Sequence, residues 1–273
     1  MSVIEHFRNF LKGNFSILIT GQRKSGKSAL MYRLGEIAHE LRKDRNVYVV
    51  NLPDTPKARA LLPDWIKPLD KKDLDKVENA ILLFEESSLI ALSRNWFTRF
   101  NKLLSQLNAI AYHKRQSHIY VIQNMRLLDP NIISLIDVVM VKQYSYVQYK
   151  LEREMLRDIV STSVMMLRRI PLSERKKFAV VVGFYDYPPF LFKYDLPSFW
   201  KEDLAYLWES FQFADLEDIT HKTDLETAVD LIKAGKVKTW KDLKQYFPEK
   251  SENSLKVLLS RARKKIKEDS LIP

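Results

Sequence analysis

One octapeptide in this chain brings glycine, lysine and serine together at a spacing that can hold phosphate. It runs from Gly21 to Ser28 and reads GQRKSGKS, which fits the Walker A pattern. Its glycines let the backbone wrap so that N–H groups point inward at phosphate oxygens, and a helix starting near Ser28 would add its positive dipole end. The pattern therefore predicts a phosphate-binding loop. We expect contacts from Gly21, Gln22, Arg23, Lys24, Ser25, Gly26, Lys27, Ser28 and Ala29.

Two side chains of this loop have specific expected roles toward a nucleoside triphosphate. Lys27 would act as a catalytic residue by reaching the β and γ phosphates of ATP, and the Ser28 hydroxyl would ligate Mg²⁺. Arg23 and Lys24 add positive charge, which could face the triphosphate, DNA or solvent. ATP and Mg²⁺ are therefore the predicted cofactors.

Two adjacent acids end a second apolar run, AILLFEE, at Glu85 and Glu86. Neighbouring side chains at the end of a strand point to opposite sides, so the pair can serve two purposes. We expect Glu85 to bind Mg²⁺ through a water molecule and Glu86 to be the catalytic base that polarises the attacking water. The alternative is a pair of exposed acids on a loop.

A third apolar run, HIYVIQN, ends in Gln123 and Asn124. If this strand lies beside the loop in a parallel sheet, its end is close to the γ phosphate. A neutral amide there can sense the nucleotide and transmit its state. We therefore include Gln123 among the predicted catalytic residues.

The elements that must position these residues are alternating strands and helices. A helix is predicted from Ser28 to about Arg42 because its apolar residues recur at helical spacing, and a longer one from about Leu89 to Lys114. Such alternation implies an α/β fold, a P-loop NTPase with a mainly parallel, RecA-like sheet and helices on both faces. The strands are predicted at 15–20, 47–52, 80–86, 118–124 and 137–143.

The character of the chain changes after Tyr149. An amphipathic helix is predicted over 151–169 and an aromatic-rich helix over 199–213. Between them, residues 176–197 alternate in polarity and contain Pro188 and Pro189, which favours a hairpin or two edge strands. The predicted domains are a P-loop ATPase domain at 1–205, a linker at 206–222 and a small all-helical domain at 223–273.

Composition excludes several classes of protein. The chain has 273 residues, 46% of them hydrophobic, a formal net charge of +11 and no cysteine. This excludes a mainly disordered chain, a disulfide scaffold and a cysteine nucleophile. No stretch approaches the roughly 18 apolar residues of a membrane span, so we expect a cytoplasmic protein without one. High charge with few glycines is typical of a hot environment.

The surplus of positive charge favours nucleic acid as a partner, although a basic surface that aids solubility is the alternative. In the last fifty residues three short helices are predicted at 224–234, 240–246 and 251–267, and the third contains six cations and one acid. Together they resemble a helix-turn-helix whose third helix enters a major groove of double-stranded DNA. The alternative is a basic helix that packs on the ATPase domain or on a neighbouring subunit.

The third helix is expected to have an apolar face and a DNA-binding face. Lysine and arginine would contact phosphates, while Asn253 and Arg263 could reach base edges. The apolar face comprises Leu255, Leu258, Leu259, Ala262 and Ile266, and the predicted DNA-contact residues are Asn253, Lys256, Ser260, Arg263, Lys264 and Lys267.

Residues from about Phe15 to Val141 resemble the FtsK/HerA superfamily of DNA-pumping P-loop ATPases, especially its zonula occludens toxin-like and viral genome-packaging members. The resemblance rests on the Walker A loop, the acidic strand end and the segment from His113 onward. In that segment a basic patch precedes a strand ending in Gln123, followed by LLD and a hydrophobic strand. Members commonly have Asp-Glu where this chain has two glutamates, a departure that bears on hydrolysis rather than on binding. Toxin-like members commonly carry a membrane anchor; we expect none here, which favours the packaging or plasmid-transfer branch.

The resemblance implies a ring-shaped homo-oligomer, often a hexamer, in which one subunit supplies an arginine to its neighbour's ATP. Arg115 is the candidate, although the family's arginine usually lies somewhat further from the glutamine. Arg126 and Arg94 are the reserves, and a solvated helix end is the alternative for Arg115. A capsid or transfer-apparatus protein is a further implied partner.

These features predict an ATP-hydrolysing translocase or packaging motor of a virus or mobile genetic element that acts on double-stranded DNA. The alternative is an ATP-switched DNA-binding regulator or partition factor with slow hydrolysis. A small-molecule phosphotransferase is disfavoured because no arginine-rich lid segment is evident and because its chemistry has no use for the basic tail.

Overall fold

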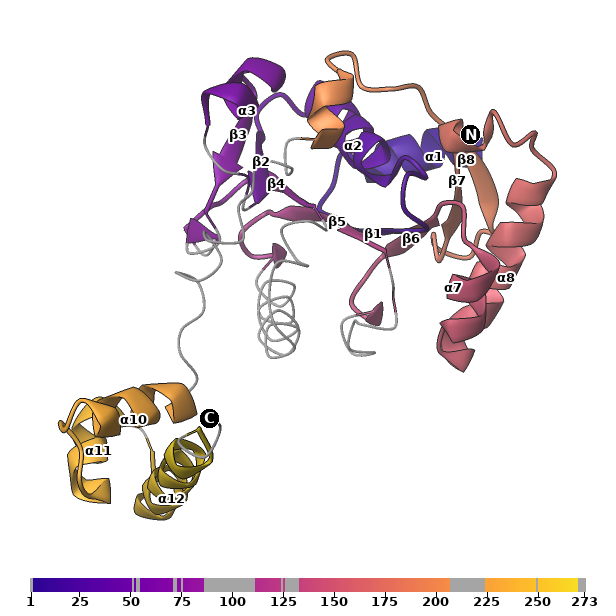
Figure 1. Cartoon of the computed structure of the whole chain (residues 1–273). Coiled ribbons are helices and arrows are strands. Elements are labelled where there is room, and N and C mark those ends of the chain that lie inside the picture. Colours follow the sequence, from indigo (N-terminus) through magenta and orange to yellow (C-terminus); the bar gives the residue numbers. More distant parts are fainter. Residues whose placement is uncertain are drawn as a thin grey trace. The chain divides into compact units, whose positions relative to one another are not determined.

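The computed structural model consists of two compact units, Met1–Phe211 and Gln212–Pro273 (Figure 1). Their division falls within the segment expected to be a linker. The structure describes residues 2–50, 52, 55–70, 73–74, 76–85, 111–123, 125, 133–206, 224–248 and 250–269. Each unit is treated by itself below.

A single sheet forms the centre of the first unit, and its described strands follow the order β3-β2-β4-β5-β1-β6-β7-β8. From β3 to β6 all neighbours are parallel, whereas β7 and β8 are antiparallel. The prediction of a mainly parallel α/β sheet is therefore confirmed. The strands are β1 (Ser16–Thr20), β2 (Asn46–Val50), β3 (Ile66–Leu69), β4 (Ala80–Phe84), β5 (Ser117–Ile122), β6 (Val138–Val141), β7 (Phe178–Val182) and β8 (Phe190–Lys193).

The five strands predicted as buried runs are all present, as β1, β2, β4, β5 and β6, and the predicted hairpin is β7 and β8. Of the two alternatives, a hairpin or two edge strands, the structure has the hairpin, and only β8 lies at the sheet edge because β7 pairs with β6 on its other side. The sequence analysis missed β3. This strand is short and contains Lys67 and Pro68, so it shows no apolar run, and its place at the sheet edge tolerates the proline.

Helices cover both faces of this sheet, as predicted. Alternate residues of one strand enter two different cores: Ile17 and Ile19 of β1 belong to one, and Leu18 to the other. The first core includes side chains from α1 (Val3–Phe10), α2 (Lys27–Leu41) and α3 (Pro56–Leu61), and the second includes Leu156 and Val160 of α8 (Glu154–Arg168). The sheet is therefore the middle of three layers.

Local sequence explains where several helices begin. Ser2 and Glu5 form a capping box at α1, and Ser145 and Gln148 form another at α7 (Tyr146–Leu151). The helix predicted at 151–169 is α8, which α7 precedes across a break at residues 152–153. The helix predicted at 89–114 lies mostly outside the described residues. Of the one predicted at 199–213, residues 202–206 form the 3₁₀ helix η4 (Glu202–Tyr206), and 207–213 lie outside the described residues.

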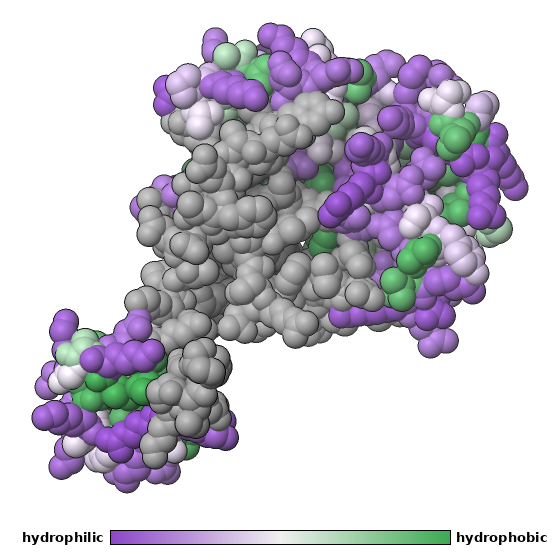
Figure 2. All heavy atoms as spheres, viewed as in Figure 1, coloured by the Kyte–Doolittle hydropathy of each residue, from purple (hydrophilic) through white to green (hydrophobic). Residues whose placement is uncertain are grey.

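The second unit contains three helices in its described part, α10 (Asp224–Lys233), α11 (Trp240–Tyr246) and α12 (Glu252–Asp269), at the predicted positions. They share a core of their own, which includes Ala228, Leu243 and Leu255. Gly235 closes α10 with a φ of 70°, a left-handed conformation that favours glycine. Figure 2 shows an apolar patch on the visible face of this unit, with hydrophilic side chains around it. No described helix in either unit is long and apolar enough to cross a membrane.

Candidate nucleotide-binding site

Three neighbouring strands bring the predicted phosphate loop, Glu85 and Gln123 together at the carboxyl ends of the strands. The loop follows β1, Glu85 follows β4 and Gln123 follows β5, and these strands are adjacent in the order β4-β5-β1. Thr20 at the end of β1 pairs in register with Ile122 at the end of β5. The predicted neighbourhood of β5 and the loop is therefore confirmed, and the carboxyl ends of parallel strands are where α/β proteins bind ligands.

The loop between β1 and α2 has a backbone that its glycines make possible. Gly21 has a φ of 148° and Gly26, the N-cap of α2, has a φ of 88°, while Lys24 also adopts a positive φ of 59°. No side chain caps this helix end, and the first amides of a helix have no carbonyl partner inside it. The loop and helix start therefore present N–H groups suited to an anion.

The side chains of the loop fit a phosphate group. Lys27 is 8% exposed, and its Nζ donates to the carbonyl oxygens of Gly21 and Gln22 at 3.0 Å each. Ser25 is buried, and its Oγ has no hydrogen-bond partner among the described residues. A buried hydroxyl without a partner is costly, and a phosphate oxygen would satisfy it.

Ser28 and Glu85 meet across the site. The Ser28 hydroxyl donates to Oε1 of Glu85 at 2.7 Å, and Glu85 is 7% exposed. Because the hydroxyl donates, its oxygen lone pairs remain for a metal ion. The described residues contain no cluster of three or more His, Cys, Asp or Glu that could hold a metal. Mg²⁺ instead usually takes few protein oxygens and completes its shell with water and substrate phosphates, so Ser28 and Glu85 fit it.

The charge on Glu85 acts on Tyr32, a buried residue of α2. Burial, and then the nearby Glu85 carboxylate, raise the pKa of Tyr32 well above its ordinary value. The phenol is therefore neutral at physiological pH. Of this pair, only the Glu85 carboxylate is then negatively charged. A cation bound between Ser28 and Glu85 would neutralise that charge.

Gln123 contacts the phosphate loop directly. Nε of Arg23 donates to Oε1 of Gln123 at 3.3 Å, and Nε2 of Gln148 in α7 donates to the Gln123 carbonyl oxygen at 3.4 Å. Arg23 is otherwise exposed. Gln123 thus connects the loop to α7, a connection that a sensing residue requires.

The sequence analysis missed Lys142 and Tyr194, which lie behind the loop. Lys142 follows β6 and Tyr194 follows β8, and both are buried. Two backbone hydrogen bonds fix β6 to the loop, because Lys142 N donates to Thr20 O at 2.8 Å and Gln22 N donates to Gln143 O at 2.7 Å. One signal was available: a lysine directly after a fully apolar strand is unusual in a sheet buried on both faces.

Several predicted residues lie elsewhere. Glu86, Arg94 and Arg126 are outside the described residues. Arg115 precedes β5 and so lies at the amino ends of the parallel strands, whereas Lys27 lies at their carboxyl ends. It therefore cannot contact a nucleotide that the same chain's loop holds. As an arginine supplied to a neighbouring subunit it stays a prediction.

The basic helix α12 has the two faces that its sequence predicts. Leu255, Leu259 and Ala262 are buried, and the exposed side chains include Asn253, Lys256, Ser260, Arg263 and Lys264. The side chain of Lys267 lies outside the described residues.

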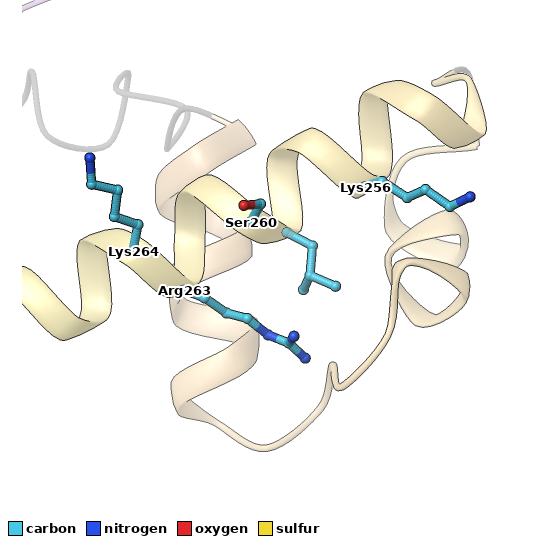
Figure 3. A pocket seen from close by; sticks show the side chains of 5 residues that line it. Lys256, Ser260, Arg263 and Lys264 are labelled. Atoms are coloured by element: carbon cyan, nitrogen blue, oxygen red, sulfur yellow. The ribbon is translucent and has the colours of Figure 1, made fainter.

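The cations of α12 also have contacts within their own unit. Nη2 of Arg263 donates to the Lys238 carbonyl oxygen at 2.6 Å, and Nζ of Lys256 lies 2.6 Å from Oε1 of Glu252. Lys256, Leu259, Ser260, Arg263 and Lys264 line an open surface groove of about 420 Å³ (Figure 3). Arg263 therefore braces the turn before α11, whereas Lys264 points away from that turn.

No protein-family model and no curated protein matches the chain. Among solved structures it is similar to the genome-packaging NTPase B204 of Sulfolobus turreted icosahedral virus 2 in complex with ATP-gammaS, at 11% identity and a TM-score of 0.44 over 67% of this chain and 98% of that one. It is also similar to ATPases 2 and 3 of EssC from Geobacillus thermodenitrificans, at 15% identity and a TM-score of 0.44 over 76% and 44% of the chains. A DnaB-like replicative helicase gives 13% identity and a TM-score of 0.40 over 65% and 54%.

The candidate site is defined by residues of this chain. Those residues form an α/β sheet whose carboxyl edge joins a Walker A loop, an acid that contacts its serine, and an amide that contacts its arginine.

Proposed function

We propose that the protein is a P-loop ATPase that works as a translocase or packaging motor on double-stranded DNA, in a virus or a mobile genetic element. The observation that carries the ATPase part is the hydrogen bond between Ser28 and Glu85, 2.7 Å long, beside the buried Lys27. It joins the phosphate loop and an acid from another strand in one site, as hydrolysis of a magnesium-bound triphosphate requires.

Each predicted site residue has a task in this proposal. Lys27 and the loop amides bind the phosphates, and Ser28 and Glu85 would hold Mg²⁺, which supplies charge neutralisation. Glu86 accepts the proton of the attacking water. Gln123, in contact with Arg23 and Gln148, transmits the state of the loop to α7.

The DNA part of the proposal rests on α12. Its exposed face carries Lys256, Arg263 and Lys264 in a unit that has its own core. Lysine and arginine on one helix face are suited to the phosphates of a duplex. A ring of identical subunits, with Arg115 supplied to the neighbouring ATP and a capsid or transfer protein as partner, completes the proposed motor.

The test is ATP turnover of the full chain with and without duplex DNA. The motor predicts turnover that duplex DNA stimulates, that Glu86→Gln abolishes and that Lys27→Ala prevents by removing ATP binding. Mass measurement with a non-hydrolysable ATP analogue, with and without duplex, should show assembly when both are present. Turnover that is indifferent to DNA and to Glu86→Gln would contradict the motor.

A second candidate is an ATP-switched DNA-binding regulator. It is favoured by one observation, that the basic helix belongs to a compact unit separate from the sheet and so can bind DNA by itself. This candidate predicts protection of one defined duplex site, with hydrolysis that is slow or dispensable. Protection without sequence preference, together with DNA-stimulated turnover, excludes it in favour of the motor.

A further inference from the structure

A fully buried lysine lies behind the phosphate loop, apart from the Walker residues. Lys142 is 0% exposed. Its Nζ donates to the carbonyl oxygens of Lys176 and Phe178 at 2.7 and 2.6 Å and to the Tyr194 hydroxyl at 2.7 Å. All three ammonium hydrogens therefore have an oxygen acceptor, an arrangement that favours the charged form.

Tyr194 connects this lysine to the loop. Its hydroxyl lies 3.1 Å from the Gly26 carbonyl oxygen and 2.8 Å from that of Lys176, either of which can accept its hydrogen. Gly26 is the N-cap of α2 and the residue before Lys27. The contact thus runs from the ammonium through one phenol to the start of the phosphate-binding helix.

The loop also packs closely on these two side chains. A Cβ at Gly21 would lie 2.7 Å from Cβ of Lys142, and one at Gly26 would lie 3.3 Å from the Tyr194 hydroxyl oxygen. The space behind the loop is therefore filled by Lys142 and Tyr194. Replacing either side chain should therefore shift the backbone of the loop, because closely packed neighbours transmit changes in volume.

The charges around Lys142 are unbalanced in the free protein. The groups that face its ammonium are Lys27 from α2, the Tyr194 phenol and the carbonyls before and at the start of β7. Burial, and then the positive charge of Lys27, lower the pKa of Lys142 to about 7, and burial raises the pKa of Tyr194 so that it stays neutral. None of these facing groups carries negative charge.

We propose that Lys142 and Tyr194 form an internal brace of the phosphate loop, in which the Lys142 ammonium is a second, buried positive charge that strengthens polyphosphate binding. Lys142 is a positioning residue, because it contacts the loop and not the ligand. The inference rests on the proposed nucleotide binding. It adds that this binding is coupled to protonation of Lys142.

The sign of the pH dependence follows from the charges. Bound polyphosphate is negative and raises the pKa of Lys142 above its value of about 7 in the free protein. Binding therefore takes up a proton near neutral pH. The gain in affinity is fully present below about pH 7 and is lost as the pH rises through the raised pKa.

The experiment is calorimetric titration of the full chain with Mg²⁺ and the slowly hydrolysed ATP analogue ATP-gammaS, from about pH 7 to pH 9, where its acidic terminal thiophosphate is ionised throughout. The wild-type affinity should fall about fivefold over this range if the pKa rises by about one unit, because Lys142 is already half deprotonated in the free protein at pH 7. Lys142→Met should bind about fivefold more weakly at pH 7 and lose the pH dependence. Lys193→Met, an exposed change on the same strand end as Tyr194, should match the wild type.

A second pair of measurements covers the case in which Lys142→Met does not fold. Tyr194→Phe should weaken binding and reduce its pH dependence, because the ammonium loses one acceptor. Wild-type titration in two buffers of different ionisation enthalpy should show uptake of a fraction of a proton at about pH 7.5.

The outcomes separate the two proposals. Absence of any nucleotide binding by the wild type contradicts the proposed function. Binding without proton uptake, or binding by Tyr194→Phe and Lys142→Met with the wild-type pH profile, overturns the brace and leaves the proposed function standing.

Discussion

Ser28 and Glu85, which lie 57 positions apart in the sequence, are joined by a hydrogen bond of 2.7 Å between the hydroxyl and Oε1. The contact forms because Glu85 directly follows β4 while Ser28 lies in the first turn of α2, at the same end of the parallel strands. It involves Glu85, at a position where the ATPases that the sequence resembles commonly have aspartate. With the longer side chain, the carboxylate reaches the serine directly.

Replacing Ser28 should separate metal use from nucleotide binding. In Ser28→Ala the hydroxyl that faces Glu85 is lost, so Mg²⁺-dependent ATP turnover should fall by about 100-fold, as for other lost transition-state contacts. Nucleotide binding without Mg²⁺ should change little. Steady-state turnover over a Mg²⁺ series measures this, and Ser173→Ala, an exposed serine, is the control. A Mg²⁺ profile equal to the wild type would refute the assignment.

Glu86→Gln should remove the base and leave the rest of the site intact. Turnover is expected to fall about 10²- to 10⁴-fold, the usual contribution of general base catalysis, while the affinity for ATP stays within about twofold. Single-turnover kinetics and equilibrium titration measure the two quantities. Undiminished turnover would assign the base to another residue.

Gly21→Ala should disturb the loop more than Gly35→Ala disturbs α2. A Cβ at position 21 would meet Cβ of Lys142 at 2.7 Å with φ at 148°, whereas one at position 35 would meet the movable Leu83 methyl groups at 3.3 Å. We expect a loss of about 1–3 kcal/mol in the free energy of unfolding for Gly21→Ala, and weaker ATP binding. Thermal unfolding of both variants tests this; equal midpoints would contradict it.

His118 should make the sheet unit sensitive to acid. Its Nδ1 and Nε2 pair with the Tyr120 hydroxyl at 2.8 Å and Gln116 Oε1 at 3.2 Å. Burial, and then the charge of Arg45, lower its pKa to about 3. Because the unfolded histidine takes a proton near pH 6.5 and the folded one does not, stability is complete above that pH and decreases as the pH falls toward 3.

The decrease amounts to about 3 kcal/mol between pH 6.5 and pH 4, at about 1.4 kcal/mol per pH unit. Calorimetric melting of the sheet unit over this range measures it. His118→Gln should flatten the acid limb, while His113→Gln, at an exposed position, should leave it unchanged. An acid limb that persists in His118→Gln would assign the sensitivity to other groups.

Single lysines of α12 should set the salt dependence of DNA binding. Lys256→Ala and Lys264→Ala should each lower the slope of log affinity against log salt by about 0.9 if they contact phosphates. Lys43→Ala, an exposed change in the sheet unit, should not. Fluorescence anisotropy with a duplex at several salt concentrations measures the slopes, and unchanged slopes would remove α12 from the interface.

Arg263→Ala should do more than weaken binding. The guanidinium donates to Lys238 O at 2.6 Å, so its loss should also lower the melting temperature of the helical unit. A variant that loses affinity with an unchanged melting temperature would show that Arg263 acts through DNA alone.

The local sequence determined those parts of the protein that depend only on neighbouring residues along the chain. The glycine spacing of residues 21–28 predicted the loop, and the apolar runs predicted β1, β2, β4, β5 and β6, because a strand buried on both faces has to be apolar throughout. The amphipathic spacing of 251–267 likewise predicted α12 and its buried face.

Tertiary structure alone decided which of these pieces meet. Strand order placed β5 between β4 and β1, which brought Glu85 to Ser28 and Gln123 to Arg23, and it placed Arg115 at the opposite end of the strands. It also placed Lys142 and Tyr194 behind the loop. The physical reason is that these contacts depend on sheet order and on the packing of distant strands, and neither leaves a periodic pattern in the local sequence.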